Sequence, residues 1–167
     1  MMPSLVEIAR YLQLKGRPLE GELLERTREL LAEAPIVPRS VWAVEGDAIY
    51  LAGTIGGEFD CWQRKVALFG ATDALIAQAI GAAAVEQVMD VVEAEAKAAV
   101  PGDWGPRRSP GYGNMALSES AKILAKLNSV RNIGIVCTPE YSLLPTKSVT
   151  AILRLFDFCG RGKKKGI

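Results

Sequence analysis

A short loop at residues 107–112 contains the side chains best suited to bind a charged small molecule. Its sequence is Arg-Arg-Ser-Pro-Gly-Tyr. An arginine in a rigid loop, such as Arg107, can hold a carboxylate through two parallel hydrogen bonds. Pro110 stiffens the loop, and Gly111 has no Cβ to keep a ligand away from the backbone. Tyr112 adds an aromatic face and a hydroxyl group. The loop is therefore a candidate binding site.

The same residues also have purely structural interpretations. Arg107 and Arg108 could be an ordinary pair of surface arginines. The Ser-Pro-Gly-Tyr segment could be only a turn, with Tyr112 packed on the core. Residues 111–113, Gly-Tyr-Gly, begin a GxGxxA pattern, but they follow Arg-Arg-Ser-Pro instead of an apolar strand, so we reject a dinucleotide-binding loop. The first two interpretations stay open.

Residues that could perform catalysis or bind a metal are scarce. The chain has no histidine, which excludes Ser/His/Asp and Cys/His triads and histidine-containing zinc sites. Its cysteines, Cys61, Cys137 and Cys159, form no CxxC pair, so the sequence indicates neither a disulfide framework nor a metal site. Cys137 lies in an apolar segment and is expected to be a buried core thiol. We predict no catalytic residue and no metal ligand.

Composition indicates a soluble globular protein. Hydrophobic residues make up 49% of the chain and charged residues 23%, and the net charge is +1. No global electrostatic field therefore draws the chain to nucleic acid or to a membrane. The N-terminus lacks an apolar core of signal-peptide length, and no stretch of about 20 apolar residues is free of charges. We expect a cytoplasmic protein with neither nucleic acid nor membrane as a partner.

The length of 167 residues fits one domain. Within it we expect an N-terminal helical part at residues 1–34 and a mixed core at residues 35–158. A tail follows at residues 159–167, and its three consecutive lysines are interpreted as a solubilising end.

Helical spacing of apolar residues appears in several segments. The predicted helices cover about residues 5–12, 20–33, 59–69, 73–99 and 118–127. Thr72 or Asp73 is expected to cap the fourth of these helices. On a helical wheel, Glu86, Asp90, Glu93 and Lys97 share a face opposite Ile76, Ile80, Val88 and Val91. By periodicity alone, Glu86 belongs to a solvated helix face.

Strand patterns complete the fold prediction. Residues 41–44 and 48–51 flank Glu45-Gly46-Asp47 and predict a β-hairpin. Residues 133–137 and 148–155 are the other strand candidates. Helices and hairpins mix without a regular βαβ alternation. The expected fold class is therefore α+β, a central, mostly antiparallel sheet flanked by helices.

Three segments together resemble a known family. They are Arg-Arg-Ser-Pro-Gly-Tyr at 107–112, followed by Leu-Ser-Glu at 117–119; Ile-Gly-Ile-Val-Cys-Thr at 133–138; and Leu-Pro-Thr-Lys-Ser-Val-Thr-Ala at 144–151. In this order and spacing they resemble the S-adenosylmethionine-binding activation (reactivation) domain of cobalamin-dependent methionine synthase. The alanine-rich segment that contains Glu86 is similar to the family helix whose glutamate takes part in ligand binding. The resemblance covers about residues 70–155, roughly half of the chain, and the N-terminal third is similar only to small stand-alone relatives of this domain.

The resemblance implies a ligand and a set of binding residues. The ligand is S-adenosylmethionine, and the residues are Glu86, Arg107, Ser109, Gly111 and Tyr112. Ser109 would act mainly through its backbone, and Glu86 would accept hydrogen bonds from the ribose hydroxyls or the ammonium group. A second cofactor, cobalamin, would be bound by a partner protein.

The resemblance also implies a role in methionine biosynthesis or one-carbon metabolism. The chain would be an accessory protein in the reductive methylation, or reactivation, of a corrinoid-binding protein such as a short methionine synthase. A reductase or a flavodoxin-type electron donor would act on that partner, so any methyltransferase activity would need the corrinoid protein.

The main alternative is a regulatory module of the same fold that binds the corrinoid protein but no longer binds S-adenosylmethionine productively. Methyl transfer to an unrelated acceptor is a weaker third possibility.

Overall fold

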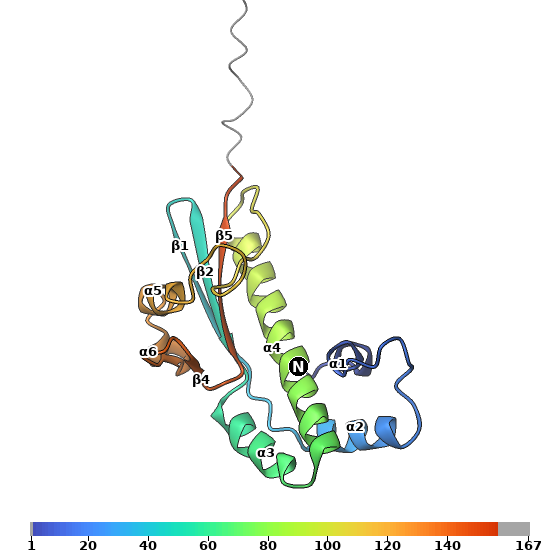
Figure 1. Ribbon diagram of the computed structural model, residues 1–167. Coiled ribbons are helices and arrows are strands. Elements are labelled where there is room, and N and C mark those ends of the chain that lie inside the picture. Colours follow the sequence, from blue (N-terminus) through green and yellow to red (C-terminus); the bar gives the residue numbers. More distant parts are fainter. Residues whose placement is uncertain (1, 157–167) are drawn as a thin grey trace, which may run out of the picture.

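A three-stranded antiparallel sheet forms the centre of the fold (Figure 1). The computed structural model describes residues 2–156. The strands β1 (Arg39–Glu45), β2 (Ala48–Thr54) and β5 (Ser148–Arg154) lie in the order β1-β2-β5. Gly46 has a φ of 60° in the β1–β2 turn, a conformation that glycine adopts at no steric cost. The hairpin and the α+β class with an antiparallel sheet are confirmed.

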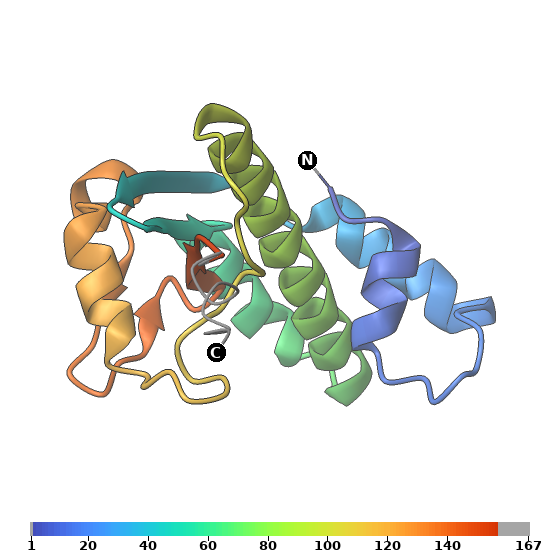
Figure 2. The same cartoon turned by 90° about the horizontal axis from the view of Figure 1, so that it is seen from above.

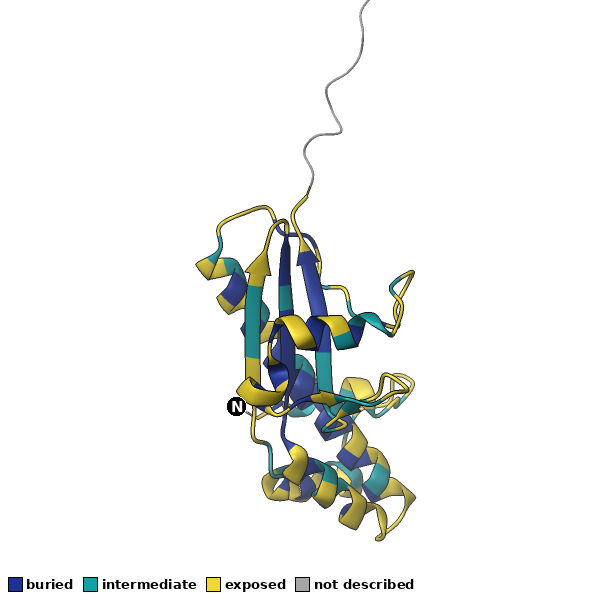
Figure 3. Ribbon diagram, turned by 90° about the vertical axis from the view of Figure 1, so that its left-hand side faces the viewer, coloured by how far each residue is buried: buried dark blue, intermediate teal, exposed yellow. Residues whose placement is uncertain are grey.

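The sheet lies between two helical layers (Figures 1 and 2). Helix α4 (Ala71–Ala99) covers one face, where Met89, Val92 and Ala96 pack against buried residues of β2 and β5. Helices α5 (Glu119–Lys126) and α6 (Ser129–Ile133) cover the other face, together with the short hairpin of β3 (Val136–Cys137) and β4 (Leu143–Leu144). The buried positions concentrate on β2, β5 and the facing sides of these helices (Figure 3).

The N-terminal helices form a further layer on the outer side of α4. Helices α1 (Leu5–Tyr11) and α2 (Gly21–Glu33) pack on α4 through a cluster that includes Ile8, Leu30 and Ile80. Helix α3 (Gly57–Ala67) joins the same cluster through Phe59. Within residues 2–156, α4 alone is long and apolar enough to cross a membrane, yet 61% of its most apolar window is buried in the fold. These contacts identify α4 as the central core helix.

Three local expectations were wrong or incomplete. The N-cap of α4 is Gly70, and neither Thr72 nor Asp73 caps the helix, because Asp73 instead accepts hydrogen bonds from Arg26. The expected strand at 133–137 shortens to β3, since α6 continues to Ile133 and Gly134 turns the chain with a φ of 74°. Cys137 is only half-buried, beside the cluster under α5. The lysine-rich tail and Cys159 lie outside the described residues.

Candidate ligand-binding site

The loop after α4 runs along the outer edge of β5. The Gly105 N–H donates to Arg154 O at 2.8 Å, and Arg108 and Ile152 exchange both backbone hydrogen bonds at 3.0 and 2.9 Å. At the start of the loop, Trp104 Nε1–H donates a 2.8 Å hydrogen bond to Val100 O, at the end of α4. The loop therefore has a fixed position, held by the backbone of the sheet.

Arg107 extends from this loop to α4. Its Nη2 lies 2.5 Å from Glu86 Oε2, and its Nη1 lies 3.1 Å from Asp90 Oδ1 and 3.3 Å from Glu93 Oε2. The Arg107 side chain is only 17% exposed, whereas that of Glu86 is 44% exposed. Arg108 instead donates to Asn114 Oδ1 at 2.9 Å. The two arginines are therefore not an ordinary surface pair, and Glu86 does not belong to a merely solvated helix face.

The Ser-Pro-Gly-Tyr segment forms a compact turn. Tyr112 N–H donates to Ser109 O at 3.3 Å, and Gly111 N–H donates to Met115 O at 3.0 Å. Gly111 has a φ of 88°, where a side chain would be strained, and a Cβ there would lie 3.3 Å from Leu117 Cδ1. Tyr112 is 77% exposed, so it does not pack on the core as one interpretation of the sequence required.

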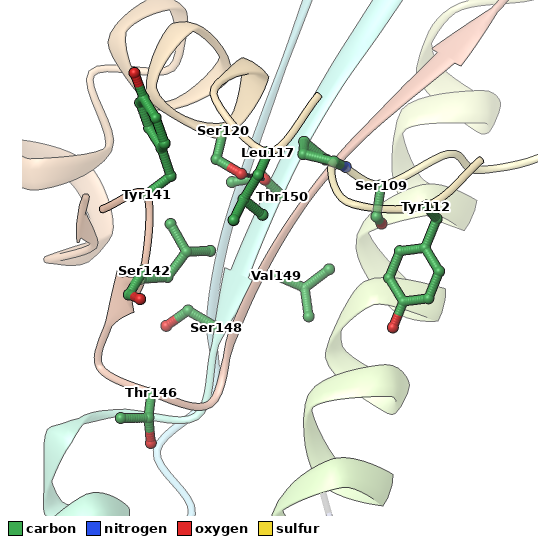
Figure 4. Close-up of a pocket in the computed structure, with 12 residues that line it drawn as sticks. Ser109, Tyr112, Leu117, Ser120, Tyr141, Ser142, Thr146, Ser148, Val149 and Thr150 are labelled. Atoms are coloured by element: carbon green, nitrogen blue, oxygen red, sulfur yellow. Dashed lines mark hydrogen bonds between the residues drawn. The ribbon is translucent and has the colours of Figure 1, made fainter. Parts of the chain in front are cut away.

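Two neighbouring cavities open on either side of this turn. The first, of about 450 Å³, lies toward α4 and is lined by Glu86, Arg107, Arg108, Ser109, Tyr112, Gly113 and Val149. The second, of about 490 Å³, lies toward α5 and the β3–β4 hairpin (Figure 4). Ser109, Tyr112 and Val149 line both cavities, which together form one groove. Each volume is in the range of small-molecule sites.

Hydroxyl groups line the second cavity. Thr150 Oγ1 lies 3.2 Å from Ser120 Oγ, and Ser148 Oγ lies 2.9 Å from Thr54 Oγ1. Tyr141 lies at the end of this cavity away from Tyr112, as Figure 4 shows. The groove thus has a charged compartment beside α4 and an uncharged, hydroxyl-lined compartment beside α5.

Helix α1 reaches the site from the other side of α4. A cavity of about 200 Å³ is lined by Glu7, Arg10, Tyr11, Ala83, Glu86, Gln87 and Asp90. Burial raises the pKa of the Tyr11 hydroxyl, and the negative charges of Glu86 and Asp90 raise it further. Glu86 therefore faces two cavities, one bounded by the 107–113 loop and one bounded by α1.

The structure brings most of the sequence-predicted residues together. Glu86, Arg107, Ser109 and Tyr112 line the charged compartment, whereas Gly111 lines neither compartment and shapes the turn between them. Their roles in ligand binding stay predictions. Within residues 2–156, no three His, Cys, Asp or Glu side chains are arranged to hold a metal ion.

Sequence reasoning missed several residues of the groove. Ser120, Tyr141 and Thr150 come from a helix, a hairpin loop and a strand that are distant in sequence. Single hydroxyl residues form no sequence motif, so only the tertiary structure reveals that they converge. Asp90 and Glu93 had a detectable signal, since they share the helix face of Glu86 at positions i+4 and i+7.

Comparison with known proteins finds the same fold in a solved structure. No family model and no curated protein matches the chain. The crystal structure of the MetH reactivation domain bound to AdoHcy matches it with a TM-score of 0.63. The match covers 85% of this chain and 68% of that one at 14% sequence identity. The resemblance expected from the sequence is thereby confirmed at the level of the fold.

Proposed function

We propose that the protein binds S-adenosylmethionine and serves as an accessory protein in the reductive methylation of a corrinoid protein such as methionine synthase. The observation that supports this most is a two-compartment groove at the 107–112 loop, in a fold shared with a MetH reactivation domain that was crystallised with AdoHcy. S-adenosylmethionine has a zwitterionic amino-acid end and an uncharged adenosine end. The charged compartment suits the first, and the hydroxyl-lined compartment suits the second.

Arg107 and Glu86 would bind the amino-acid end by exchanging partners. The 2.5 Å ion pair between them occupies Arg107 Nη2. A ligand ammonium group would take Glu86 as its acceptor and release Nη2 for the ligand carboxylate, so the charges stay balanced. Asp90 and Glu93 would continue to hold Arg107 Nη1 in place. Tyr112 would contribute its aromatic face, and Ser109 its backbone.

The chain itself would contribute to methyl transfer by orienting S-adenosylmethionine and by enclosing it in the groove. S-adenosylmethionine supplies a sulfonium methyl group, and a reduced cobalt centre on the partner is the nucleophile. No general base is needed for such a transfer, and none is predicted for the chain. Orientation alone can lower a barrier by about 7–11 kcal/mol when the reacting atoms are held in line. The groove would hold the ligand while a corrinoid protein docks over it.

The proposed partners follow from this chemistry. A cytoplasmic corrinoid protein, such as a short methionine synthase, would bind the cobalamin. A reductase or flavodoxin-type donor would reduce that partner, and the present chain would act on it only after reduction. Any methyltransferase activity would therefore appear in the assembled system and not with this chain alone.

One observation favours a second candidate function. The Arg107 guanidinium already pairs with three carboxylates, so an incoming ligand must displace at least one of them. If that exchange costs too much, the protein would be a regulatory module that binds the corrinoid protein without productive S-adenosylmethionine binding.

Calorimetric titration with S-adenosylmethionine separates the two functions. We expect saturable binding at one site, lost in a Glu86→Gln, Arg107→Ala double variant. Methyl transfer from labelled S-adenosylmethionine to a reduced corrinoid protein should then be faster with the chain than without it. Equal transfer rates across several corrinoid proteins, with no calorimetric binding, would favour the regulatory module.

A further inference from the structure

One edge of the central sheet is open. Among residues 2–156, β1 is the outermost strand on its side and pairs with β2 alone (Figures 1 and 3). Its ladder with β2 is unbroken over all seven residues from Arg39 to Glu45. The edge at β5 is instead partly covered, because the loop after α4 pairs with it at Ile152. A further strand can therefore join the sheet at β1.

The backbone of Ser40, Trp42 and Val44 faces this open edge. Backbone N–H and C=O groups alternate in direction along a strand. Ile152 bonds to Arg108, away from β2, so the odd-numbered residues of β5 bond to β2. Followed through the β2–β5 and β1–β2 registers, this alternation leaves the even-numbered residues of β1 pointing outward. Within the described part of the chain, their outward N–H and C=O groups have no hydrogen-bond partner.

β1 lacks the features that usually protect an open edge. Such edges are commonly blocked by a proline, a bulge or an inward-pointing charge. The β1 sequence, Arg-Ser-Val-Trp-Ala-Val-Glu, has no proline, and its ladder has no bulge. Its charged residues lie only at the two ends. Val44 is 45% exposed, which leaves an apolar side chain beside the unpaired backbone groups. The edge is therefore suited to the addition of a strand.

The two terminal charges of β1 indicate which strand is added. Arg39 begins the strand and Glu45 ends it. In an antiparallel pair of two β1 strands, Arg39 of each copy can lie opposite Glu45 of the other. Among the described residues, Glu45 pairs with Lys126 of its own chain, whereas Arg39 has no carboxylate within ion-pair distance. The β1 edge is thus complementary in charge to itself.

One register of this pair uses the whole edge. When Trp42 of each copy lies opposite Trp42 of the other, all outward groups of the two strands are paired. A shift in one direction brings in Pro38, which has no N–H to donate, and a shift in the other brings in Gly46 of the turn. Either shift also separates the opposite charges at the strand ends, which stabilise a pairing when they face each other. The self-complementary register is therefore the one centred on Trp42.

We propose that β1 pairs antiparallel with β1 of a second copy of this chain, centred on Trp42, to form a two-fold symmetric dimer. The two central sheets then form one continuous sheet, and the two ends of the contact are equivalent. The grooves at the 107–112 loops lie at the β5 edges, on the opposite side of each sheet from β1, so the contact leaves them open. This inference goes beyond the proposed function and does not depend on it.

Removal of one outward N–H tests the contact. Val44→Pro eliminates a donor in each copy, and proline is tolerated on an edge strand where the N–H faces solvent. Sedimentation of the full chain over a range of concentrations should show a reversible dimer, with a dissociation constant roughly tenfold or more higher for Val44→Pro. Val44→Thr is the matched control, because threonine has a similar shape and keeps the N–H. Circular dichroism verifies the fold of each variant.

Reversal of the end charges tests the identity of the added strand and its register. Arg39→Glu and Glu45→Arg should each dimerise more weakly than the wild type, because like charges then face each other at both ends. A mixture of the two variants should form a heterodimer, since opposite charges meet again at both ends. Arg28→Glu on α2 is the control, with the same change in net charge outside β1.

Hydrogen exchange identifies the surface that forms the dimer. The amides of Ser40 and Trp42 should exchange more slowly as the concentration of the chain rises. A dimer in which these amides exchange as fast as in the monomer forms through another surface and would overturn the proposal. A wild-type chain that stays monomeric up to its solubility limit would do the same, and would leave the β1 edge to a strand of a different protein.

Discussion

Arg107 Nη2 and Glu86 Oε2 lie 2.5 Å apart across 21 residues of sequence. Two features of the chain produce this pair. The bridge between Arg108 and Ile152 fixes the loop on β5, so that the preceding residue reaches α4. The spacing of Glu86, Asp90 and Glu93 on α4 presents three carboxylates to one guanidinium. The charged compartment is therefore held together by contacts between the chain's own residues.

Replacement of Arg107 tests whether this pair binds the ligand. We expect Arg107→Ala to weaken S-adenosylmethionine binding by about 1.5–3 kcal/mol, the range for a hydrogen bond to a charged group. Arg107→Lys should restore only part of it, because an ammonium group cannot contact three carboxylates with a planar fork. Arg28→Ala is the control, since Arg28 pairs with Glu25 on α2 and lines neither compartment. Unchanged dissociation constants for both Arg107 variants would place the carboxylate-binding group elsewhere.

Valine substitutions at Gly111 and Gly16 distinguish the effect of the 107–112 turn on ligand binding from the effect of backbone strain on stability. Gly111→Val forces a β-branched residue into a φ of 88° and places its Cβ 3.3 Å from Leu117 Cδ1. Gly16 has a similar φ of 82° in the α1–α2 connection, with nothing within 4 Å of a Cβ. Gly16→Val and Gly111→Val should lose similar stability. Only Gly111→Val should lose ligand binding and most of the acceleration of methyl transfer. Calorimetry and the corrinoid assay measure these effects, and equal binding by both variants would exclude a role for the turn.

Most of the fold could be predicted from local sequence patterns. The β1–β2 hairpin has its Gly46 turn signal, and the amphipathic spacing around Ile76 and Ile80 marks the long helix. The predictions failed where tertiary contacts compete with local preference. Asp73 is a good capping residue in isolation, but a bidentate arginine from α2 is a stronger partner than the helix end.

The site was only partly predictable for a related reason. The Arg107 to Tyr112 turn is contiguous, so its sequence contains a recognisable pattern. The hydroxyl-lined compartment combines Ser120, Tyr141 and Thr150 from three separate elements, and no single segment indicates it.

Close packing between α3 and α4 leads to a prediction about stability. A Cβ at Gly81 would lie 2.6 Å from Phe59 Cε1 and 2.7 Å from Lys147 Cε. Phe59 is fully buried, so its ring could move only by displacing neighbouring core residues. Alanine gains about 1 kcal/mol of helix propensity over glycine, whereas overpacking of a core costs about 1–3 kcal/mol. We expect Gly81→Ala to lower the free energy of unfolding by up to about 2 kcal/mol.

Gly57→Ala is the matched control for Gly81→Ala. A Cβ at Gly57 would have Pro145 Cγ at 3.8 Å as its nearest neighbour, an ordinary contact. Urea unfolding followed by circular dichroism should show Gly57→Ala to be neutral or slightly stabilising. A Gly81→Ala protein as stable as the wild type would mean that α3 packs less closely on α4 than the structure indicates.

The pair of Arg26 and Asp73 predicts a pH dependence of stability. Arg26 Nη2 lies 2.6 Å from Asp73 Oδ2, and its Nε lies 3.0 Å from Oδ1, so the pair joins α2 to α4. These hydrogen bonds hold the pKa of the Asp73 carboxyl below its usual value. The folded state therefore binds this proton less tightly than the unfolded state, in which the pKa is about 3.9. The stabilisation is complete above that value and is lost as the pH falls through the lower, folded-state pKa.

We accordingly expect Asp73→Asn to unfold at a lower temperature than the wild type at pH 7, and the difference to shrink below about pH 4. Glu29→Gln is the control, because Glu29 also pairs with Arg26 but is 61% exposed. An exposed ion pair contributes little, so this variant should follow the wild type at every pH. Thermal unfolding followed by circular dichroism between pH 3 and pH 8 measures both. If the deficit of Asp73→Asn were as large at pH 3 as at pH 7, the stabilisation would come from packing of the Asp73 side chain and not from its charge.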